Sequence, residues 1–253
     1  MHEEQLGYGG SMNVIPMLST ILTFGFTIAV YKRYRQKKRT QLLIWTFGLF
    51  LYGLGTLSEV IMSITFSELV LKVWYLTGAM LTAAWLGQGT VHLLVRKRGV
   101  ARTLTVVLSL LSFLVLGLIV MAPITSAAAS YDVTQPISSQ YKDILVRNGA
   151  IIFLTILLNL YGTVALVGGA IYSAFLFWRK RVLVQRMFGN ILIAAGALLP
   201  AIGGSFLKIG LTDMLYISEL FGVILMYAGF LVATALEAEV ERYRTSDAEA
   251  AAD

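Results

Sequence analysis

Seven long apolar stretches, separated by polar segments, dominate this 253-residue chain. A helix that crosses a bilayer needs about 20 mostly apolar residues. Strands of a membrane barrel would instead alternate apolar and polar residues over about 10 positions, and these runs are too long and too continuously apolar for that. We therefore predict an all-α membrane protein, a bundle of seven transmembrane helices, at residues 14–31, 42–64, 69–95, 103–121, 150–178, 187–206 and 214–236.

Composition supports this class and narrows the chemistry. The chain is 57% hydrophobic and 13% charged, with a mean hydropathy of +0.76, outside the range of soluble globular proteins. It has no cysteine, which excludes disulfides, thiol catalysis, thiolate zinc sites and covalent haem attachment. The helices and their connections account for the length. We expect one membrane domain over residues 14–236, an outer tail at 1–13 and a cytoplasmic tail at 237–253 that frays.

The basic residues are distributed unevenly and predict the orientation. Of 20 Lys and Arg, six lie in the first connection, four in the third, four in the fifth and two in the C-terminal tail. Short segments rich in Lys and Arg stay in the cytoplasm. We therefore expect the N-terminus outside and the C-terminus inside. Basic runs beside crossing helices also contact anionic lipid, so membrane lipids are expected partners and the net charge of +6 requires no nucleic acid.

Small and polar residues recur along the predicted helices at alternating steps of four and three. In lipid, helices associate through such residues, so these stripes are expected to face the bundle interior. Two of the stripes are Gly48, Tyr52, Gly55 and Glu59, and Trp74, Gly78, Leu81, Trp85, Gln88 and His92. In the sixth span Pro200 removes a backbone donor and Gly203 and Gly204 follow it, so this segment is predicted to act as a hinge. The outer connection 122–149 is long and without periodicity, which is typical of a functional or a mobile loop.

Charged side chains near the outer ends of the stripes form the first candidate site. Glu59 and Glu219 lie about 7 Å inside their helix ends, at 1.5 Å rise per residue. An intramembrane carboxylate is costly and usually faces the bundle interior with a partner. One interpretation is a ligand-binding pocket made by Glu59, Trp74, Tyr75, Lys208, Tyr216 and Glu219. The other is a structural Glu–Lys pair that joins the sixth and seventh helices.

A second polar cluster is expected near the inner face. It consists of Gln88, His92 and Asn190. His92 is the only histidine outside the N-terminal tail, so one chain cannot hold a haem between two histidines, and a catalytic metal site lacks ligands. We expect no metal and no cofactor, and we interpret these residues as hydrogen-bonding groups between helices.

One segment carries a resemblance to known proteins. The run from Trp74 to Gly89, WYLTGAMLTAAWLGQG, resembles a segment of uncharacterised bacterial seven-helix membrane proteins. The whole bundle is more loosely similar to the seven-helix sensing region of some bacterial histidine kinases. The resemblance implies a bacterial inner-membrane protein that passes a signal to a separate protein partner. A microbial rhodopsin would carry retinal on a lysine of its seventh helix, and residues 214–236 contain no lysine.

These observations favour a receptor-like, non-enzymatic membrane protein that binds a small or lipophilic ligand in the outer half of the bundle. A small proton-coupled transporter is the first alternative, with Glu59 and Glu219 as the titrating carboxylates. An accessory or structural subunit of a larger membrane complex is the second. An enzyme is disfavoured because the sequence offers no serine–histidine, paired-aspartate or multi-histidine arrangement.

Overall fold

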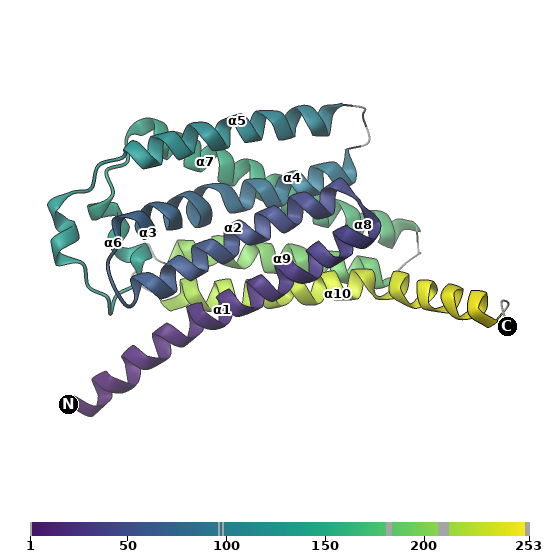
Figure 1. Ribbon diagram of the computed structural model, residues 1–253, viewed down its shortest axis with the longest axis horizontal. Helices are drawn as coiled ribbons and strands as arrows, with labels where there is room; N and C mark the ends of the chain where they lie inside the picture. Colours follow the sequence, from purple (N-terminus) through teal and green to yellow (C-terminus); the bar gives the residue numbers. More distant parts are fainter. Residues whose placement is uncertain (1, 96, 98, 181–183, 207–212, 251–253) are drawn as a thin grey trace.

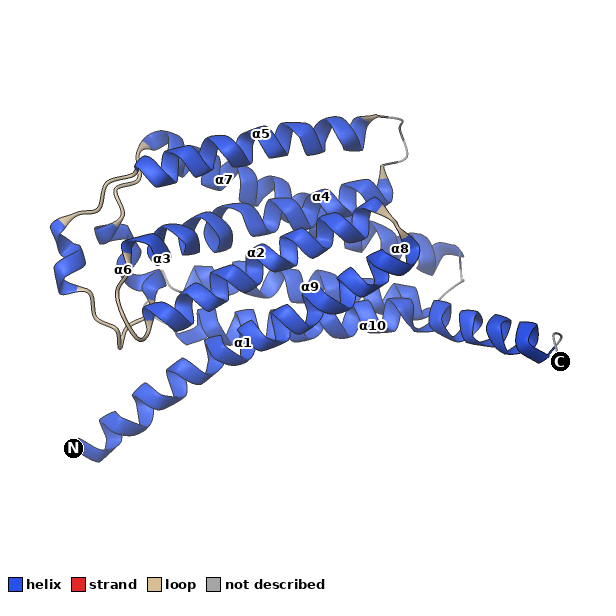
Figure 2. Ribbon diagram, in the orientation of Figure 1, coloured by secondary structure: helices blue, strands red, loops and turns tan. Residues whose placement is uncertain are grey.

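The structure, a computed structural model, is a bundle of helices (Figure 2). It describes the backbone of residues 2–95, 97, 99–180, 184–206 and 213–250, and the side chains of 14–95, 97, 99–176, 178–179, 187–200, 202–203 and 214–235. Within these residues there is no strand, only an isolated antiparallel bridge between Ile124 and Leu145. The prediction of an all-α fold is confirmed.

The helices begin and end close to the predicted spans. In chain order they are α1 (His2–Lys37), α2 (Thr40–Met62), α3 (Glu68–Trp74), the π-helix η1 (Tyr75–Leu81), α4 (Thr82–Leu94), α5 (Val100–Met121), the 3-10 helix η2 (Ser126–Ser130), α6 (Ile137–Ile144), α7 (Gly149–Thr163), the π-helix η3 (Val164–Gly168), α8 (Gly169–Lys180), α9 (Val184–Phe206) and α10 (Asp213–Ala250). Helix α1 includes most of the predicted outer tail, and α10 continues through most of the predicted cytoplasmic tail.

Among the described residues, six helical segments are long and apolar enough to cross a membrane. They are Val14–Lys37, Thr40–Met62, Glu68–Leu94, Val100–Met121, Gly149–Leu176 and Met214–Ala235. The predicted sixth span forms helix α9, whose apolar part over the described residues, Met187–Pro200, is shorter than the others. The structure therefore supports a multi-pass membrane protein.

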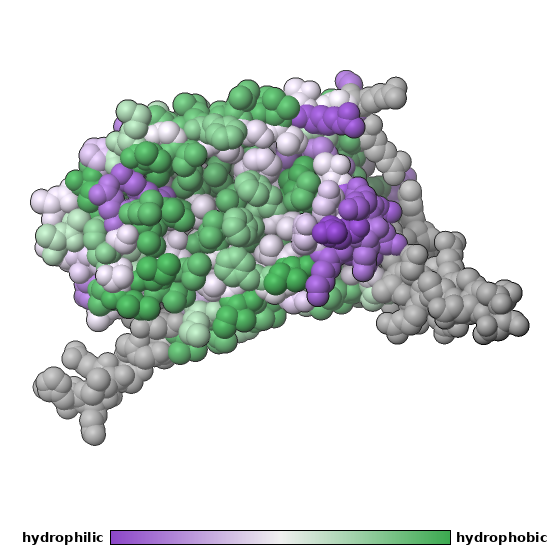
Figure 3. Space-filling view, in the orientation of Figure 1, coloured by the Kyte–Doolittle hydropathy of each residue, from purple (hydrophilic) through white to green (hydrophobic). Residues whose placement is uncertain are grey.

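The bundle has two distinct ends (Figure 1). At one end, which we call the cap end, the segment Ala122–Asn148 covers the helices, and the N-terminus lies on this side. At the other, which we call the basic end, α1, α4 and α8 finish and the C-terminus lies beyond them. Figure 3 shows a largely apolar surface over the helices and a hydrophilic patch at the basic end. The six basic residues between positions 32 and 39 lie where α1 ends and α2 begins.

Helices α9 and α10 pack against each other along much of their length, and α1 packs on α2 and α10. Helix α5 is peripheral, since only 17% of its apolar stretch is buried, against 56% for α2. Polar residues pack well in α1 because each hydroxyl of Thr20, Thr23 and Thr27 donates to the carbonyl four residues earlier in its own helix. This hydroxyl-lined face was not among the predicted stripes.

Two spans are wound as π-helix in their middle. Span α3–η1–α4 contains η1, and span α7–η3–α8 contains η3. π-Helical turns are rare and occur frequently at functional sites. The two spans pack against each other, with η1 against α7 and η3 against α4, so both irregular segments lie at one helix–helix interface.

The connection 122–149 is a packed cap. Two backbone hydrogen bonds join its ends, from Thr125 N to Ile144 O (2.9 Å) and from Val146 N to Pro123 O (3.0 Å). Ile137, Ile144 and Leu145 are at most 2% exposed. Burial of these side chains against the bundle supplies the apolar contacts that a mobile loop lacks.

Candidate functional site

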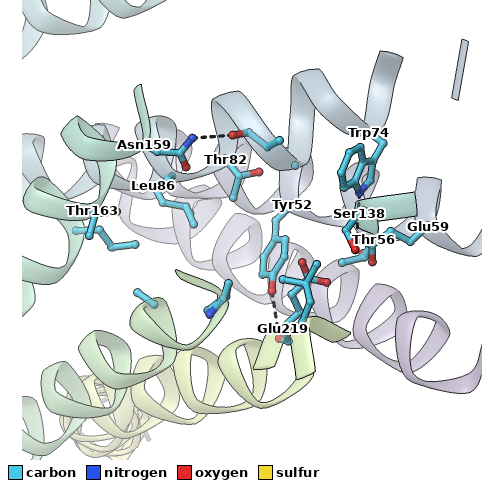
Figure 4. Close-up of a pocket in the computed structure, with 18 of the residues that line it drawn as sticks. Tyr52, Thr56, Glu59, Trp74, Thr82, Leu86, Ser138, Asn159, Thr163 and Glu219 are labelled. Atoms are coloured by element: carbon cyan, nitrogen blue, oxygen red, sulfur yellow. Dashed lines mark hydrogen bonds between the residues drawn. The ribbon is translucent and has the colours of Figure 1, made fainter. Parts of the chain in front are cut away.

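A cavity of about 290 Å³ lies inside the bundle, beneath the cap (Figure 4). Its size is near the lower end of small-molecule pockets. The wall is built from α2, α3, α4, α6, α7, α9, α10 and the two π-helices. The lining residues are Tyr52, Gly55, Thr56, Glu59, Trp74, Gly78, Ala79, Thr82, Ala83, Leu86, Ser138, Tyr141, Asn159, Thr163, Leu166, Ala197, Pro200, Leu215, Glu219 and Met226.

Close packing of two glycines brings the polar residues of the cavity together. A Cβ atom on Gly55 of α2 would lie 3.0 Å from the Cα atom of Gly78 in η1, so the two backbones touch. Glu59 lies one turn after Gly55, and Trp74 lies one turn before Gly78. The crossing therefore places the two side chains together, and the indole Nε1 of Trp74 donates to Oε1 of Glu59 at 3.0 Å.

The Glu59 carboxyl is buried and only half satisfied. The residue is 3% exposed, and its Oε2 atom has no hydrogen-bond partner among the described residues. The carboxyl group of Glu219 lies beside it. Tyr52 joins the same corner, since its hydroxyl donates to the backbone carbonyl of Glu219 at 3.1 Å. Two carboxyl groups thus share one poorly solvated wall, where like charges repel strongly.

Side chains of the cap form the wall of the cavity at the cap end. Ser138 of α6 lines it, is 4% exposed, and its Oγ has no hydrogen-bond partner within the described part of the chain. The ring of Tyr141 packs edge-on against Trp74, with centroids 5.1 Å apart. The guanidinium of Arg147 lies over the ring of Tyr141, 4.9 Å from its centroid. The outer wall therefore combines aromatic rings with a buried hydroxyl.

Tyr131 anchors the cap to the bundle. Its hydroxyl donates to the carbonyl of Met62, the last residue of α2, at 3.2 Å. Its ring packs against Phe66 with centroids 5.2 Å apart. Burial, together with the charge of neighbouring Asp132, raises the pKa of Tyr131 to about 12, so the hydroxyl stays protonated and keeps donating at neutral pH.

Hydrogen bonds hold η1 in its irregular winding. The side-chain amide of Asn159 in α7 donates to the carbonyl of Ala79 (2.7 Å) and to that of Thr155 (2.9 Å). The Thr82 hydroxyl donates to the carbonyl of Thr77 at 2.8 Å. The Asn159 amide therefore ties the Ala79 carbonyl of η1 to α7, and the Thr82 hydroxyl reinforces the backbone bond from Thr82 N to Thr77 O. Asn159, Ala79 and Thr82 line the cavity.

The predicted outer cluster is distributed around this cavity. Glu59, Trp74 and Glu219 line it. Tyr75 is buried beside it, where its hydroxyl pairs with the Thr155 hydroxyl at 3.1 Å. Tyr216 is buried, and its hydroxyl contacts the backbone of Ile137 in the cap. Lys208 lies outside the described residues, and so does the predicted pair between Lys208 and Glu219.

The predicted hinge adjoins the same cavity. Pro200 lines it, within helix α9. Gly203 faces α10, since a Cβ atom there would lie 3.2 Å from the Cα atom of Leu215. Gly204 is helical, and its surroundings are outside the described side chains. Bending at Pro200 stays a prediction.

The predicted inner cluster separates into two parts. Gln88 is fully buried, and its Nε2 donates to Ala101 O (2.9 Å) and to Thr105 Oγ1 (2.8 Å), while its Oε1 accepts from the hydroxyl of Tyr161. His92 Nε2 lies 2.7 Å from the same Thr105 hydroxyl. These bonds tie the peripheral α5 to α4 and α7. Asn190 lies on α9 and is not among the hydrogen-bond partners of Gln88 and His92 within the described residues, which are Ala101, Thr105 and Tyr161.

The cap residues Ser138 and Tyr141 were missed by sequence reasoning. A signal existed in the residues themselves, because Ile137, Ser138, Tyr141 and Ile144 recur at the spacing of one face of a short helix, directly after Pro136. That helix has eight residues, and the long polar segment around it hid the pattern.

Comparison with known protein families, with curated proteins and with solved structures gives no match for this chain. The site is therefore interpreted from its own geometry.

Proposed function

We propose that this chain is a receptor-like, non-enzymatic membrane protein that binds a small ligand in the cavity beneath the cap. The observation that carries the proposal is the pair of buried polar atoms, Glu59 Oε2 and Ser138 Oγ, that face one cavity without partners among the described residues. Buried polar groups are nearly always hydrogen-bonded. A bound molecule that supplies donors would satisfy both atoms.

The proposal includes seven crossings, with the cap outside and the basic end in the cytoplasm. Helix α9 packs along α10, a candidate span, and the N- and C-termini lie at opposite ends of the bundle (Figure 1), as an odd number of crossings requires. The basic segment between α1 and α2, and Arg242 and Arg244 near the C-terminal end of α10, lie toward one end (Figure 1), which favours the cytoplasm for that end.

A ligand in this position would contact elements that can move relative to one another. The cavity wall includes Pro200 of α9, Glu219 of α10 and Gly78 of η1. A ligand shifts a conformational equilibrium by its difference in affinity for the two states. We infer that occupancy changes how α9 and α10 pack against η1, and that a partner protein at the basic end detects this change.

A small proton-coupled transporter is the second function that a specific observation favours. A smaller cavity, about 50 Å³, lies among Phe26, Val30, Trp45, Leu49, Leu86, Leu166, Ile193, Met226 and Phe230. It shares Leu86, Leu166 and Met226 with the main cavity. Separation of those three side chains would join the two spaces, and Glu59 with Glu219 would supply a proton-binding pair.

Filling the cavity tests ligand binding. Ala197 lines the cavity, and Ala195 on the same helix is exposed, so Ala197→Phe and Ala195→Phe form a matched pair. The probes are benzylammonium, benzyl alcohol and benzoate, which are similar in size and differ in charge. At least one should raise the melting temperature of the wild type and of Ala195→Phe in detergent, but not that of Ala197→Phe. Shifts that are equal in both variants, or no shift in the wild type, would refute the proposal.

A further inference from the structure

The described lining of the cavity is acidic, and the Arg147 guanidinium, which lies over the ring of the lining residue Tyr141, is not itself part of the lining. Two of the described residues that line it are acidic, Glu59 and Glu219, and none is lysine, arginine or histidine. At the same end of the bundle, Lys72 is already engaged, with its Nζ 2.7 Å from Glu68 Oε1 and 3.0 Å from the carbonyl oxygen of Val120. Two neighbouring carboxyl groups in a poorly solvated wall favour a bound cation or a proton.

Two buried oxygen atoms of the cavity wall, Glu59 Oε2 and Ser138 Oγ, can each accept a hydrogen bond. The Trp74 indole holds Oε1 of Glu59 at 3.0 Å and so orients the carboxyl group. Oε2 of Glu59 has no hydrogen-bond partner among the described residues, and the neighbouring group is the Glu219 carboxyl. The Ser138 hydroxyl oxygen is likewise unpaired beside the same cavity. A group with several N–H donors satisfies such a set, and hydrogen bonds to a charged partner are the stronger ones.

The rest of the wall matches an organic cation better than a metal ion. Trp74, Tyr52 and Tyr141 contribute aromatic rings to the wall. The Arg147 guanidinium already lies over the Tyr141 ring, and cations bind aromatic faces favourably. Deeper in the bundle the wall is apolar, through Leu86 and Leu166. A hard metal ion such as Ca²⁺ needs six to eight oxygen ligands, and the described residues contain no group of three or more His, Cys, Asp or Glu that could hold a metal.

We propose that the ligand of this cavity is a small organic ammonium ion, whose charged group lies between Glu59, Glu219 and Ser138 and whose apolar part points toward Leu86. This inference rests on the proposed function and specifies the chemical class of the ligand. Trp74 of α3 and Tyr141 of the cap then lie around the charged group, and the apolar depth of the cavity limits the size of the attached group.

Charge-matched probes test the ligand class separately from binding itself. Benzylammonium should bind the purified protein in detergent, whereas benzyl alcohol and benzoate should bind weakly. Glu59→Gln keeps the size of the side chain and removes its charge, and it should weaken benzylammonium binding about 10- to 100-fold, the factor expected for one charge-assisted hydrogen bond. Glu68→Gln is the control, since Glu68 is an exposed carboxylate at the same end of the bundle. Glu219→Gln provides a second variant if Glu59→Gln does not fold.

The possible outcomes separate the two proposals. Equal stabilisation by all three probes, abolished by Ala197→Phe, would overturn the cation class and leave ligand binding intact. If benzyl alcohol or benzoate binds and benzylammonium does not, the cation class is likewise overturned and ligand binding stands. Binding of benzylammonium only after Lys208→Gln would also overturn the inference, because the protein's own lysine would then neutralise the carboxyl groups. Absence of any shift would overturn both proposals.

Discussion

The crossing of α4 and α7 should be intolerant of even one added methyl group. At Gly162 of α7 an added Cβ atom would overlap the backbone carbonyl of Ala83. From the other side, a Cβ atom on Gly87 would lie 2.8 Å from the carbonyl oxygen of Gly162. Both neighbours are backbone atoms, so no rotamer change can relieve the overlap. Gly162→Ala must therefore push the two helices apart.

The loss of unfolding free energy in Gly162→Ala can be worked out by comparison with the same substitution at Gly117 of α5. A Cβ atom there meets nothing within 4 Å, so Gly117→Ala should be neutral or should gain up to about 1 kcal/mol of helix stability. Gly162→Ala makes the same gain but adds an overpacking cost of about 1–3 kcal/mol. For a domain of about this size, that difference corresponds to about 2–12 °C in melting temperature.

Thermal unfolding of both variants in the same detergent measures this difference directly. The melting temperature of Gly162→Ala should lie below that of Gly117→Ala by about 2–12 °C. Gly162→Ala should also bind any cavity probe more weakly, since Gly162 is followed directly by Thr163 of the cavity wall. Equal melting temperatures for the two variants would refute the backbone contact between α4 and α7.

Three further predictions concern the inner network, the cap and the orientation. Gln88→Leu should lower stability by about 1–3 kcal/mol, because it removes the bonds from the buried amide to Ala101 and Thr105 and leaves the Tyr161 hydroxyl without its partner; unchanged thermal unfolding would contradict this role. The pKa of Tyr131 is about 12, above its ordinary value of 10.0, so the stability that this residue contributes is complete below pH 10 and is lost between about pH 10 and pH 12. Tyr131→Phe should reduce that alkaline loss in a series of melting curves, and an identical loss would exclude the mechanism. Cysteines introduced as Ser130→Cys and Ser246→Cys should react with an impermeant reagent on intact cells only at position 130, and the reverse pattern would overturn the orientation.

The helical spans could be predicted because the membrane imposes one length and one composition on them. The predicted range 42–64 became α2, Thr40–Met62, and 69–95 became Glu68–Leu94. The same reasoning selected Glu59 and Glu219, because charged residues in an apolar helix need an interior partner. These two residues and Trp74 do line one cavity.

The remaining parts of the site depend on tertiary contacts that residue type does not reveal. The π-winding of Tyr75–Leu81 needs an amide from Asn159, about 80 positions away in sequence. The cap needs its two ends paired, as between Thr125 and Ile144. In α1, Thr20 and Thr23 are polar by composition yet buried, since a hydroxyl bonded to its own helix packs as a small residue.

The π-helix at the cavity has a consequence for chain length. Deleting one residue from a regular α-helix turns everything beyond the deletion by about 100° about the axis, because one turn takes 3.6 residues. A π-helical turn already holds more residues than an α-turn, so Tyr75–Leu81 can shorten to ordinary winding. A single-residue deletion there would leave Trp74 and Trp85 facing the directions they face now. We expect this span to accept a shorter chain where a uniform transmembrane helix such as α2 would lose its register with the bundle.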